Sequence, residues 1–566
     1  MLPFAHQIKA AALRRRPPKW PTLALAASLA AWPLPAAWSQ PVPGRDAAPA
    51  VSGLPSLGDG QGMSVAAERR LGDRIARDIY RDPDYLDDPV LGDYLQSIWQ
   101  PLLGAARARG DVAPELEDRL AWEVMLSRDR QVNAFALPGG YLGVQLGLIA
   151  VTETPDELAS VMAHELSHVS QRHIARLMAR QDKMAPWVMG AMILGALAAR
   201  ANTDVANAAL AGSQAVAAQT QLNFSRDMER EADRVGFGVL TGAGFDGQGF
   251  VGMFDKLQQA ARFNDDGAFP YLRSHPLTGE RIADMRARLP LSSVVRVAPG
   301  STAAPPGALS APTSAGGLNL NLPPPGGTAA ATSLPSPALH ALMAARARVL
   351  AENAPDRLRT QLQSGQVPNA TPGARYAAAF AAQRLGQPER ALSLAQGLQG
   401  QLAGDARVAA DHLLLELQLM ALATPATAAG TDGVGRAQRL GALRDQALAK
   451  GSRAGTLLGA QASLALGEAP RAASVLQAWV VNHPRDALAW QTLASANQAQ
   501  GQTLRAVRAE AESRVAQRDY AGAVERFKAA QALPSTLRNA DPMEQAIVDS
   551  RLRQVEELLR ESLRED

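Results

Sequence analysis

The sequence predicts a mainly α-helical protein with one small β-sheet and a helical-repeat region in its C-terminal half. Apolar residues make up 47% of the 566 residues and aromatic residues only 5%, and the richness in Ala and Leu favours helices. One hairpin signal lies within residues 133–144, and glycines recur at a repeat-like spacing near the C-terminus. At this length we expect two or three domains, each with a core of its own.

The N-terminus predicts a signal peptide over residues 1–39. Five basic residues precede a short apolar run, and residues 37–39 (Ala-Trp-Ser) place small side chains at the two positions that a signal peptidase reads. The alternative is an uncleaved membrane anchor. Pro33 and Pro35 argue against it, because they interrupt a run that is already shorter than the roughly 20 residues needed to cross a bilayer. We expect cleavage after Ser39 and a periplasmic location.

Charge and cysteine content exclude several classes of function. Removal of the leader takes away five basic residues and no acidic one, so the net charge falls from +3 to −2. The high isoelectric point is mostly a property of the leader, and we expect no nucleic-acid partner. The absence of cysteine excludes disulfides, thiolate metal ligands and a cysteine nucleophile. Any metal site must therefore use histidine and carboxylate side chains.

The predicted elements begin after a flexible lead-in, residues 40–63, which is rich in Pro, Gly, Ser and Ala. Apolar positions recur at helical spacing over residues 65–80 and 89–106, which predicts two helices. Residues 133–144 place two short apolar runs around Pro-Gly-Gly and are the best strand candidate. We assign residues 64–297 to one domain.

A long helix is predicted from Thr154 to about Arg180, because Thr154 can cap it and Pro155 suits its first position. Residues 187–199 follow as an apolar stretch that is too short to span a bilayer. A further helix is expected to begin near Ser225, whose hydroxyl can cap it.

The C-terminal half follows a segment, residues 298–337, that is rich in Pro, Gly and Ala and predicts an interdomain linker. Residues 338–566 then predict helical repeats. Gly467 and Gly501 open similar motifs 34 residues apart, which is the tetratricopeptide (TPR) period. We expect an α-helical TPR solenoid, and the alternative is an Ala-rich helical bundle.

The first candidate catalytic and metal-binding residues are those of the HExxH motif at residues 164–168. On a helix, residues four apart share a face, so His164 and His168 can bind one ion while Glu165 lies beside the water-binding position. This arrangement suits zinc-dependent hydrolysis, with Glu165 as the group that transfers protons. The alternative is a chance match on a solvated helix face, but apolar neighbours predict burial of the segment.

A catalytic zinc site needs a third protein ligand. Ile174 stands where one protease class carries a third histidine, and His173 lies half a turn off the ligand face, so we expect it to be structural. Glu229, the first glutamate after the motif, is the expected third ligand, and Asp233 on the same face would orient a ligating histidine. Glu231 projects from another face. The alternative is that these carboxylates only pair with nearby arginines.

HExxH followed about 60 residues later by ExxxD resembles the metalloproteases of the CaaX-prenyl-endopeptidase type, and Ser274-His275-Pro276 with Arg281 is similar to a downstream motif of that family. The resemblance covers about residues 64–290. It implies a zincin-like domain with one Zn²⁺ per chain. It also implies that the segment Asn133, Ala134, Phe135, Ala136 is an edge strand that pairs with extended substrate. His275 would fill the fourth position of the zinc and keep the enzyme latent, or, with Arg281, act on the oxyanion. A histidine that caps a loop is equally compatible.

With an export signal and a repeat region, the resemblance implies an endopeptidase that degrades misassembled outer-membrane proteins and assists barrel assembly. The repeats would then dock on the barrel assembly machinery. One alternative is a mostly latent chaperone or scaffold that acts through its repeats. Another is a membrane-surface protease with other substrates, for which residues 187–199 would contact the membrane.

Overall fold

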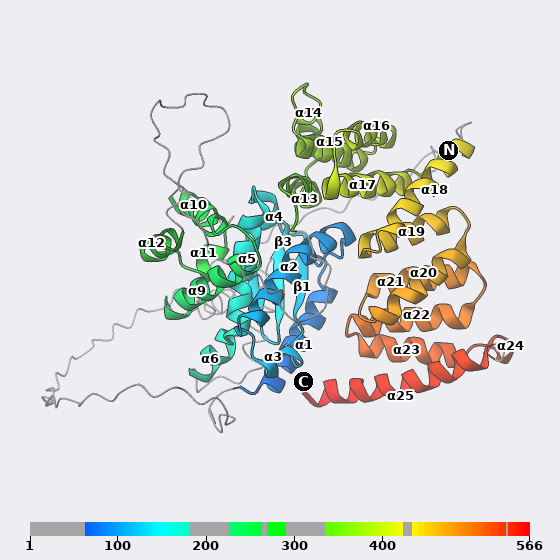
Figure 1. The fold of residues 1–566 in the computed structure, drawn as a ribbon. Helices are drawn as coiled ribbons and strands as arrows, with labels where there is room; N and C mark the ends of the chain where they lie inside the picture. The colour runs from blue at the N-terminus through cyan, green and yellow to red at the C-terminus, as the bar shows by residue number, and fades with distance from the viewer. Residues whose placement is uncertain are drawn as a thin grey trace, which may run out of the picture. The chain divides into compact units, whose positions relative to one another are not determined.

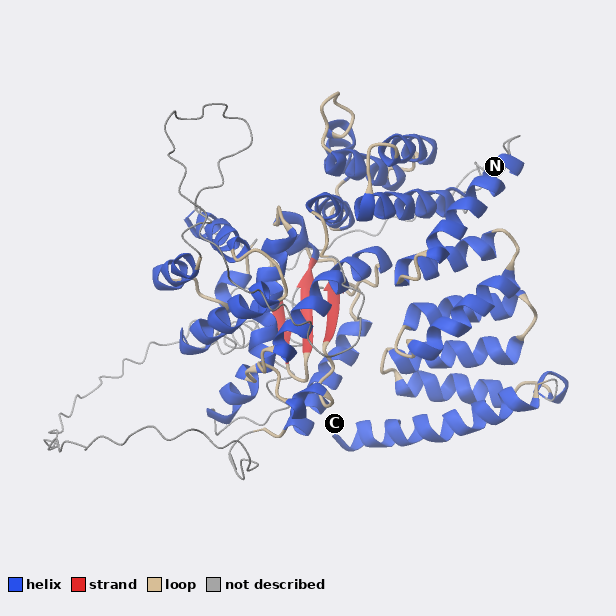
Figure 2. Ribbon diagram, viewed as in Figure 1, coloured by secondary structure: helices blue, strands red, loops and turns tan. Residues whose placement is uncertain are grey.

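The computed structural model describes residues 63–180, 226–262, 269–289, 334–422, 433–538 and 541–565, which all belong to one compact unit, Gly60–Asp566. The predicted signal peptide, nearly all of the lead-in and of the linker, the stretch 187–199 and Ser225 lie outside these ranges. The described residues are mostly helical with one three-stranded sheet (Figure 2), which confirms the predicted mainly α class. None of the helices described is long and apolar enough to cross a membrane.

The first helices begin where the sequence predicted. These two predicted helices are α1 (Val65–Arg81) and α2 (Pro89–Ala108), and the short α3 (Pro114–Glu117), which was not predicted, follows them. Ser64 caps α1 by accepting a backbone N–H, and Asp88 caps α2 in the same way. The apolar face of α2 is buried, with Trp99 fully enclosed. Since a buried side chain of this size contributes about 1.5–3 kcal/mol, α2 anchors the core of this half.

The sheet consists of β1 (Glu123–Ser127), β2 (Ala134–Leu137) and β3 (Tyr141–Gln145). Its order is β1-β3-β2, with β1 parallel and β2 antiparallel to β3. The predicted hairpin is therefore present, and Gly139 and Gly140 form its turn with φ of 77° and 85°. β1 was not predicted. Because β2 has a partner on one side only, it is an edge strand of the sheet.

The long predicted helix is in fact two helices. These are α5 (Pro155–Ser170) and α6 (His173–Arg180). The short α4 (Leu146–Val151) precedes them. Thr154 caps α5 by accepting the N–H of Glu157, as the sequence predicted. The expectation of one helix as far as Arg180 was wrong, because α5 ends at Ser170 and Arg172 adopts a φ of 52°. No glycine or proline marks this break in the sequence.

A second group of helices covers α5. It comprises α9 (Arg226–Gly242), α10 (Gln248–Arg262), α11 (Tyr271–Ser274) and α12 (Gly279–Arg288). α5 packs against α9 and α10 (Figure 1), and it also contacts β2. α9 and α5 approach closely at Gly236, where an added Cβ would lie 3.1 Å from the carbonyl oxygen of Ala163. This contact fixes the two helices relative to each other.

The C-terminal half consists of consecutive packed helices. They are α13 (Pro337–Leu350), α14 (Pro355–Ser364), α15 (Pro372–Arg384), α16 (Pro388–Gln399), α17 (Gly404–Leu422), α18 (Gly433–Ala449), α19 (Arg453–Ala465), α20 (Ala469–Asn482), α21 (Ala487–Ala499), α22 (Thr503–Ala516), α23 (Tyr520–Gln531), α24 (Ser535–Arg538) and α25 (Pro542–Glu565). The motif glycines Gly467 and Gly501 lie in the turns between α19 and α20 and between α21 and α22, each with a positive φ, and Gly386 lies likewise between α15 and α16. The repeated sequence motif therefore marks a repeated helix–turn–helix unit.

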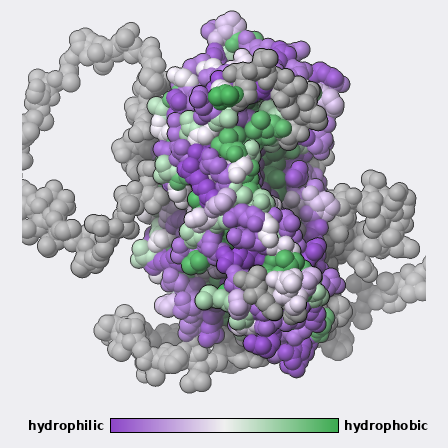
Figure 3. Space-filling model, turned by 90° about the vertical axis from the view of Figure 1, so that its right-hand side faces the viewer, coloured by the Kyte–Doolittle hydropathy of each residue, from purple (hydrophilic) through white to green (hydrophobic). Residues whose placement is uncertain are grey.

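The surface of this half is mainly hydrophilic on the side that Figure 3 shows, with smaller hydrophobic areas. Among the described residues, exposed large apolar side chains include Val481, Met543 and Leu563. Single exposed apolar side chains are common on folded proteins and need no particular partner.

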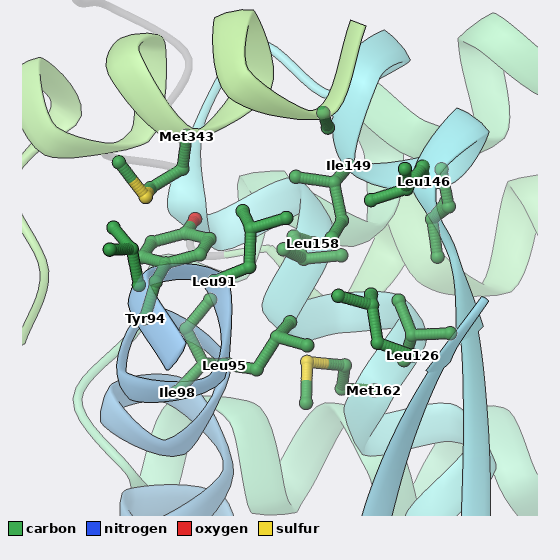
Figure 4. Packing of buried hydrophobic residues seen from close by; sticks show 14 of the residues in the cluster. Leu91, Tyr94, Leu95, Ile98, Leu126, Leu146, Ile149, Leu158, Met162 and Met343 are labelled. Atoms are coloured by element: carbon green, nitrogen blue, oxygen red, sulfur yellow. The ribbon is translucent and has the colours of Figure 1, made fainter. Parts of the chain in front are cut away.

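The first helix of the C-terminal half shares a core with the domain that precedes it. In Figure 4, Met343 of α13 packs beside Leu91 and Tyr94 of α2, and Leu158 of α5 lies in the same cluster. Arg346 of α13 is fully buried and forms an ion pair of 2.6 Å with Asp88. A buried charge of this kind is tolerated only when it is paired, so the contact specifies how α13 docks.

Candidate metal centre

Four buried side chains converge at the contact between α5 and α9. They are His164, His168, Glu229 and His275, and one donor atom from each lies within 4.8 Å of all the others. His164 and His168 lie one turn apart on α5, Glu229 lies on α9, and His275 directly follows α11. The structure thus brings together the predicted ligand set and the histidine whose place the sequence left open.

The separations between donor atoms suit a small metal ion. The Nε2 atoms of His164 and His168 are 3.0 Å apart, and His275 Nδ1 is 3.3 Å from His164 Nε2. Glu229 oxygens lie 3.1 Å from His275 Nδ1, 3.5 Å from His164 Nε2 and 3.6 Å from His168 Nε2. A tetrahedron with metal–ligand bonds of about 2.0–2.1 Å has edges of about 3.3–3.4 Å. The donor set, three imidazoles and a carboxylate, therefore fits zinc.

The charge in this buried cluster also suits a cation. Glu165, Glu229 and Asp233 are carboxylates with almost no exposed surface, and Arg281 is the buried cation beside them. Burial opposes ionisation of Glu229, but His275 and His164 outweigh it and hold its pKa well below the usual value. Three buried carboxylates thus lie beside one buried arginine, an excess of acidic groups that suits a divalent cation.

Asp233 and Arg281 orient the first ligand. Asp233 Oδ1 lies 3.0 Å from His164 Nδ1, the ring nitrogen that faces away from the other donors. Arg281 donates to both oxygens of Asp233, at 2.6 and 2.8 Å, and its Nη1 lies 2.9 Å from Glu229. Burial would lower the pKa of His164, but Asp233 and Glu229 raise it to about 9. Asp233 lies where the sequence predicted, and Arg281 is engaged with two carboxylates.

Glu165 lies beside the donor cluster and is fully buried. Its Oε2 accepts the backbone N–H of Ala136 at 2.9 Å, and its Oε1 is 3.4 Å from His275 Nε2. Burial raises the pKa of Glu165, while His275 and His164 lower it, and the first effect is larger. A carboxylate with a raised pKa is suited to accept and return a proton near neutral pH.

The predicted substrate segment forms the strand next to Glu165. Asn133 precedes β2, and Ala134, Phe135 and Ala136 lie in it. The N–H of Gln145 donates to the Asn133 carbonyl, so alternate residues pair with β3 and the backbone groups of Ala134 and Ala136 point to the free edge. One of these groups, the N–H of Ala136, is bound to Glu165 in this structure.

Two further residues belong to the site although the sequence argument placed them outside it. His173 Nδ1 lies 2.8 Å from His168 Nδ1, and His173 Nε2 lies 3.1 Å from Glu231. We expected His173 to lie off the ligand face, which holds only for a continuous helix. The break at Arg172 turns His173 back towards His168, and Glu231 reaches it from α9.

Comparison with known proteins identifies the family of this domain. The model of peptidase family M48 matches residues 95–289, which contain the three strands and all four candidate ligands. These residues are a peptidase family M48 domain. This confirms the family resemblance that the motifs indicated.

The chain is also similar to individual proteins over part of its length. The chain is 34% identical over 248 residues to a putative beta-barrel assembly-enhancing protease of Vibrio cholerae, which covers 44% of this chain and 49% of that one. It is 33% identical over 237 residues to the beta-barrel assembly-enhancing protease of Escherichia coli, with 42% and 47% covered. A mitochondrial metalloendopeptidase of Schizosaccharomyces pombe is 31% identical over 177 residues, with 31% and 49% covered. The chain spans about half the length of these relatives.

Proposed function

We propose that this protein is a zinc-dependent metalloendopeptidase. The observation that carries the proposal is the set of four buried donor atoms, all within 4.8 Å of one another, with Glu165 at its side. His164, His168 and Glu229 would hold the ion, and Asp233 would orient His164. When bound, zinc would polarise a peptide carbonyl and lower the pKa of a water molecule.

The residues of the chain supply the rest of the chemistry. Glu165, held by the N–H of Ala136, would accept a proton from the attacking water and return it to the leaving amine. The free edge of β2 offers backbone groups of Ala134 and Ala136 to an extended peptide, which would align the scissile bond beside Glu165. An enzyme that binds substrate in this way selects unfolded or locally extended chains.

We also propose that the resting enzyme is latent. His275 Nδ1 is one of the four donors, so a protein side chain fills the position that an attacking water needs. The ring of His275 stacks on Tyr271 at 4.6 Å between centroids, which supports this orientation. Displacement of His275 by substrate or by a partner would activate the site.

The cellular role is proposed from the N-terminus and from the names of the relatives. We propose a periplasmic enzyme, cleaved after Ser39, that degrades misassembled outer-membrane proteins and assists barrel assembly. Its C-terminal helix pairs would act as a TPR solenoid that docks on the barrel assembly machinery. The filled fourth position favours the alternative of a mostly latent chaperone or scaffold. The mitochondrial relative favours a protease with other substrates, for which residues 187–199 would contact a membrane.

The peptidase proposal is tested with Glu165→Gln. The purified mature chain should carry one zinc by elemental analysis and degrade casein. Glu165→Gln should keep the zinc, because the ligands remain, and lose activity by about 100-fold or more. Glu153→Gln, an exposed glutamate just before α5, is the control and should behave as wild type. Full activity of Glu165→Gln would exclude this residue from the mechanism.

The same variant separates protease from chaperone in cells. If barrel assembly is still promoted by Glu165→Gln, the chaperone alternative is favoured. If assembly and degradation of misassembled barrels are lost together, the protease role is favoured.

A further inference from the structure

We propose that His173 and Glu231 form a hydrogen-bonded relay that orients His168 and strengthens its bond to the metal. The inference rests on the proposed metal centre, but it concerns two residues that bind neither the metal nor substrate. His173 is fully buried, and its two ring nitrogens contact His168 on one side and Glu231 on the other. They are positioning residues.

The protonation pattern follows from the atoms that face one another. His168 Nε2 points into the donor cluster, 3.0 Å from His164 Nε2, so it must keep its lone pair to bind a metal. Its proton then sits on Nδ1, 2.8 Å from His173 Nδ1. The N–H of His168 therefore donates to His173, which must accept at Nδ1 and carry its own proton on Nε2.

Glu231 fixes this direction. An ionised carboxylate can only accept, and the N–H at His173 Nε2 donates to Glu231 Oε2 at 3.1 Å. Arg176 donates to the same oxygen at 2.9 Å, which holds the carboxylate ionised and in place. With the opposite tautomer, His173 would present a proton to the proton of His168 and a lone pair to Glu231. Both contacts of His173 are therefore hydrogen bonds only when His168 donates to His173 and His173 donates to Glu231.

The break between α5 and α6 makes the relay possible. Arg172 adopts the left-handed conformation, with a φ of 52°, and its side chain donates to Glu68 at 2.9 Å and to the Met63 carbonyl at 2.6 Å. Such a conformation costs free energy for a non-glycine residue, so these contacts compensate for it. In a continuous helix His173 would face away from His168.

The two ligating histidines are therefore supported differently. His164 contacts the carboxylate of Asp233 directly, whereas His168 reaches Glu231 through a second imidazole. Partners of this kind fix the ring orientation and raise the basicity of a ligand, and their loss typically weakens metal binding by about 10–100-fold.

The test measures metal affinity and not activity. Metal-free full-length mature protein is titrated with Co²⁺, whose visible absorption reports on coordination geometry. His173→Phe keeps a ring but loses the acceptor, and it should raise the Co²⁺ dissociation constant by about 10–100-fold and change the spectrum. His173→Asn keeps an acceptor near the former Nδ1 but is too short to reach Glu231, so it should weaken binding less than His173→Phe does. Glu231→Leu should weaken binding, with Asp227→Ala on the same helix as the neutral control.

The outcomes separate this relay from the metal centre itself. If wild type binds no Co²⁺, or His164→Ala binds as tightly as wild type, the proposed metal centre fails and the relay fails with it. If wild type binds but His173→Phe and Glu231→Leu bind equally well, only the relay is overturned. Should His173→Phe not fold, as judged by circular dichroism, Glu231→Leu decides, since the relay requires that it bind Co²⁺ more weakly than the Asp227→Ala control.

Discussion

At the scale of single residues, the sequence predicted those positions whose geometry is local. His164, Glu165 and His168 share one helical turn, and Glu229 and Asp233 share another, so spacing alone places each set on one face. The position of His275 could not be derived in this way. It lies 46 residues after Glu229 and enters the site only through the packing of α11 and α12. His173 is not among the four candidate ligands, but its contact with His168 was not foreseen because the helix was assumed to continue.

The proposed latency leads to a prediction for His275→Ala. Removing the imidazole should open a coordination site to water next to Glu165, while three protein ligands still hold the zinc. Proteolysis of an unfolded substrate, or self-cleavage, should rise severalfold, by about threefold to tenfold.

The measurement compares casein cleavage and zinc content in wild type and His275→Ala. Lower activity at unchanged zinc would contradict latency and would favour a role for His275 in stabilising the oxyanion. Glu280→Ala, a change at an exposed side chain of α12, serves as the control.

At the scale of elements, capping residues and apolar spacing predicted where α1, α2 and α5 begin, and Pro-Gly-Gly predicted the hairpin of β2 and β3. β1 was missed because Glu123–Ser127 has no turn signals at its ends, and it becomes a strand by pairing with β3. The end of α5 was missed for a related reason. Tertiary contacts of the Arg172 side chain, with Glu68 and Met63, support a break that the local sequence does not signal.

The close contact of α5 and α9 leads to a prediction for Gly236→Ala. The added Cβ would lie 3.1 Å from the Ala163 carbonyl oxygen and 3.2 Å from His164 Cα, so the helices must separate slightly. We expect a loss of about 1–3 kcal/mol in stability and weaker zinc binding, because Glu229 moves with α9.

Thermal unfolding and zinc content of Gly236→Ala should be compared with those of Gly104→Ala. Gly104 lies inside α2 with no atom near an added Cβ, and its replacement should stabilise the protein by about 0.5–1 kcal/mol. Equal stability and zinc binding in both variants would show that α5 and α9 can accommodate an added methyl group at Gly236 without a cost.

At the scale of the whole molecule, composition and repeat spacing predicted a helical C-terminal half, but not its contacts. Asp88 and Arg346 are 258 residues apart, and Tyr94 and His340 are 246 apart. Nothing in the spacing of either segment indicates its partner. These pairs arise because α13 buries its apolar side against α2 and α4, which brings the polar groups on that side together.

This contact predicts a loss of stability at acidic pH. His340 is buried, accepts the hydroxyl of Tyr94 and donates to the Thr152 carbonyl at 2.9 Å. Burial lowers its pKa below the value of 6.5 that the unfolded chain has. The unfolded state therefore binds the proton more readily, and the free energy of unfolding falls as the pH drops below 6.5.

The measurement is the unfolding temperature at pH values of about 7.5 and about 5.5. His340→Gln can keep both hydrogen bonds but cannot take up a proton, so its unfolding temperature should fall less than that of wild type. His483→Gln, at an exposed position, should retain the full wild-type decrease. If all three proteins respond alike, His340 does not contribute to the acid sensitivity.

The guanidinium of Arg281 links the α9 ligand region, at Asp233 and Glu229, to the segment that carries His275. It makes two bonds to Asp233, approaches Glu229, and donates one bond of 2.8 Å to the carbonyl of Pro276, next to His275. If His275 is displaced together with Pro276, the bond of Arg281 that must break is the one to the Pro276 carbonyl. The two bonds to Asp233 would remain, so His164, His168 and Glu229 would keep their arrangement while His275 is away. His275 could then return to the same position.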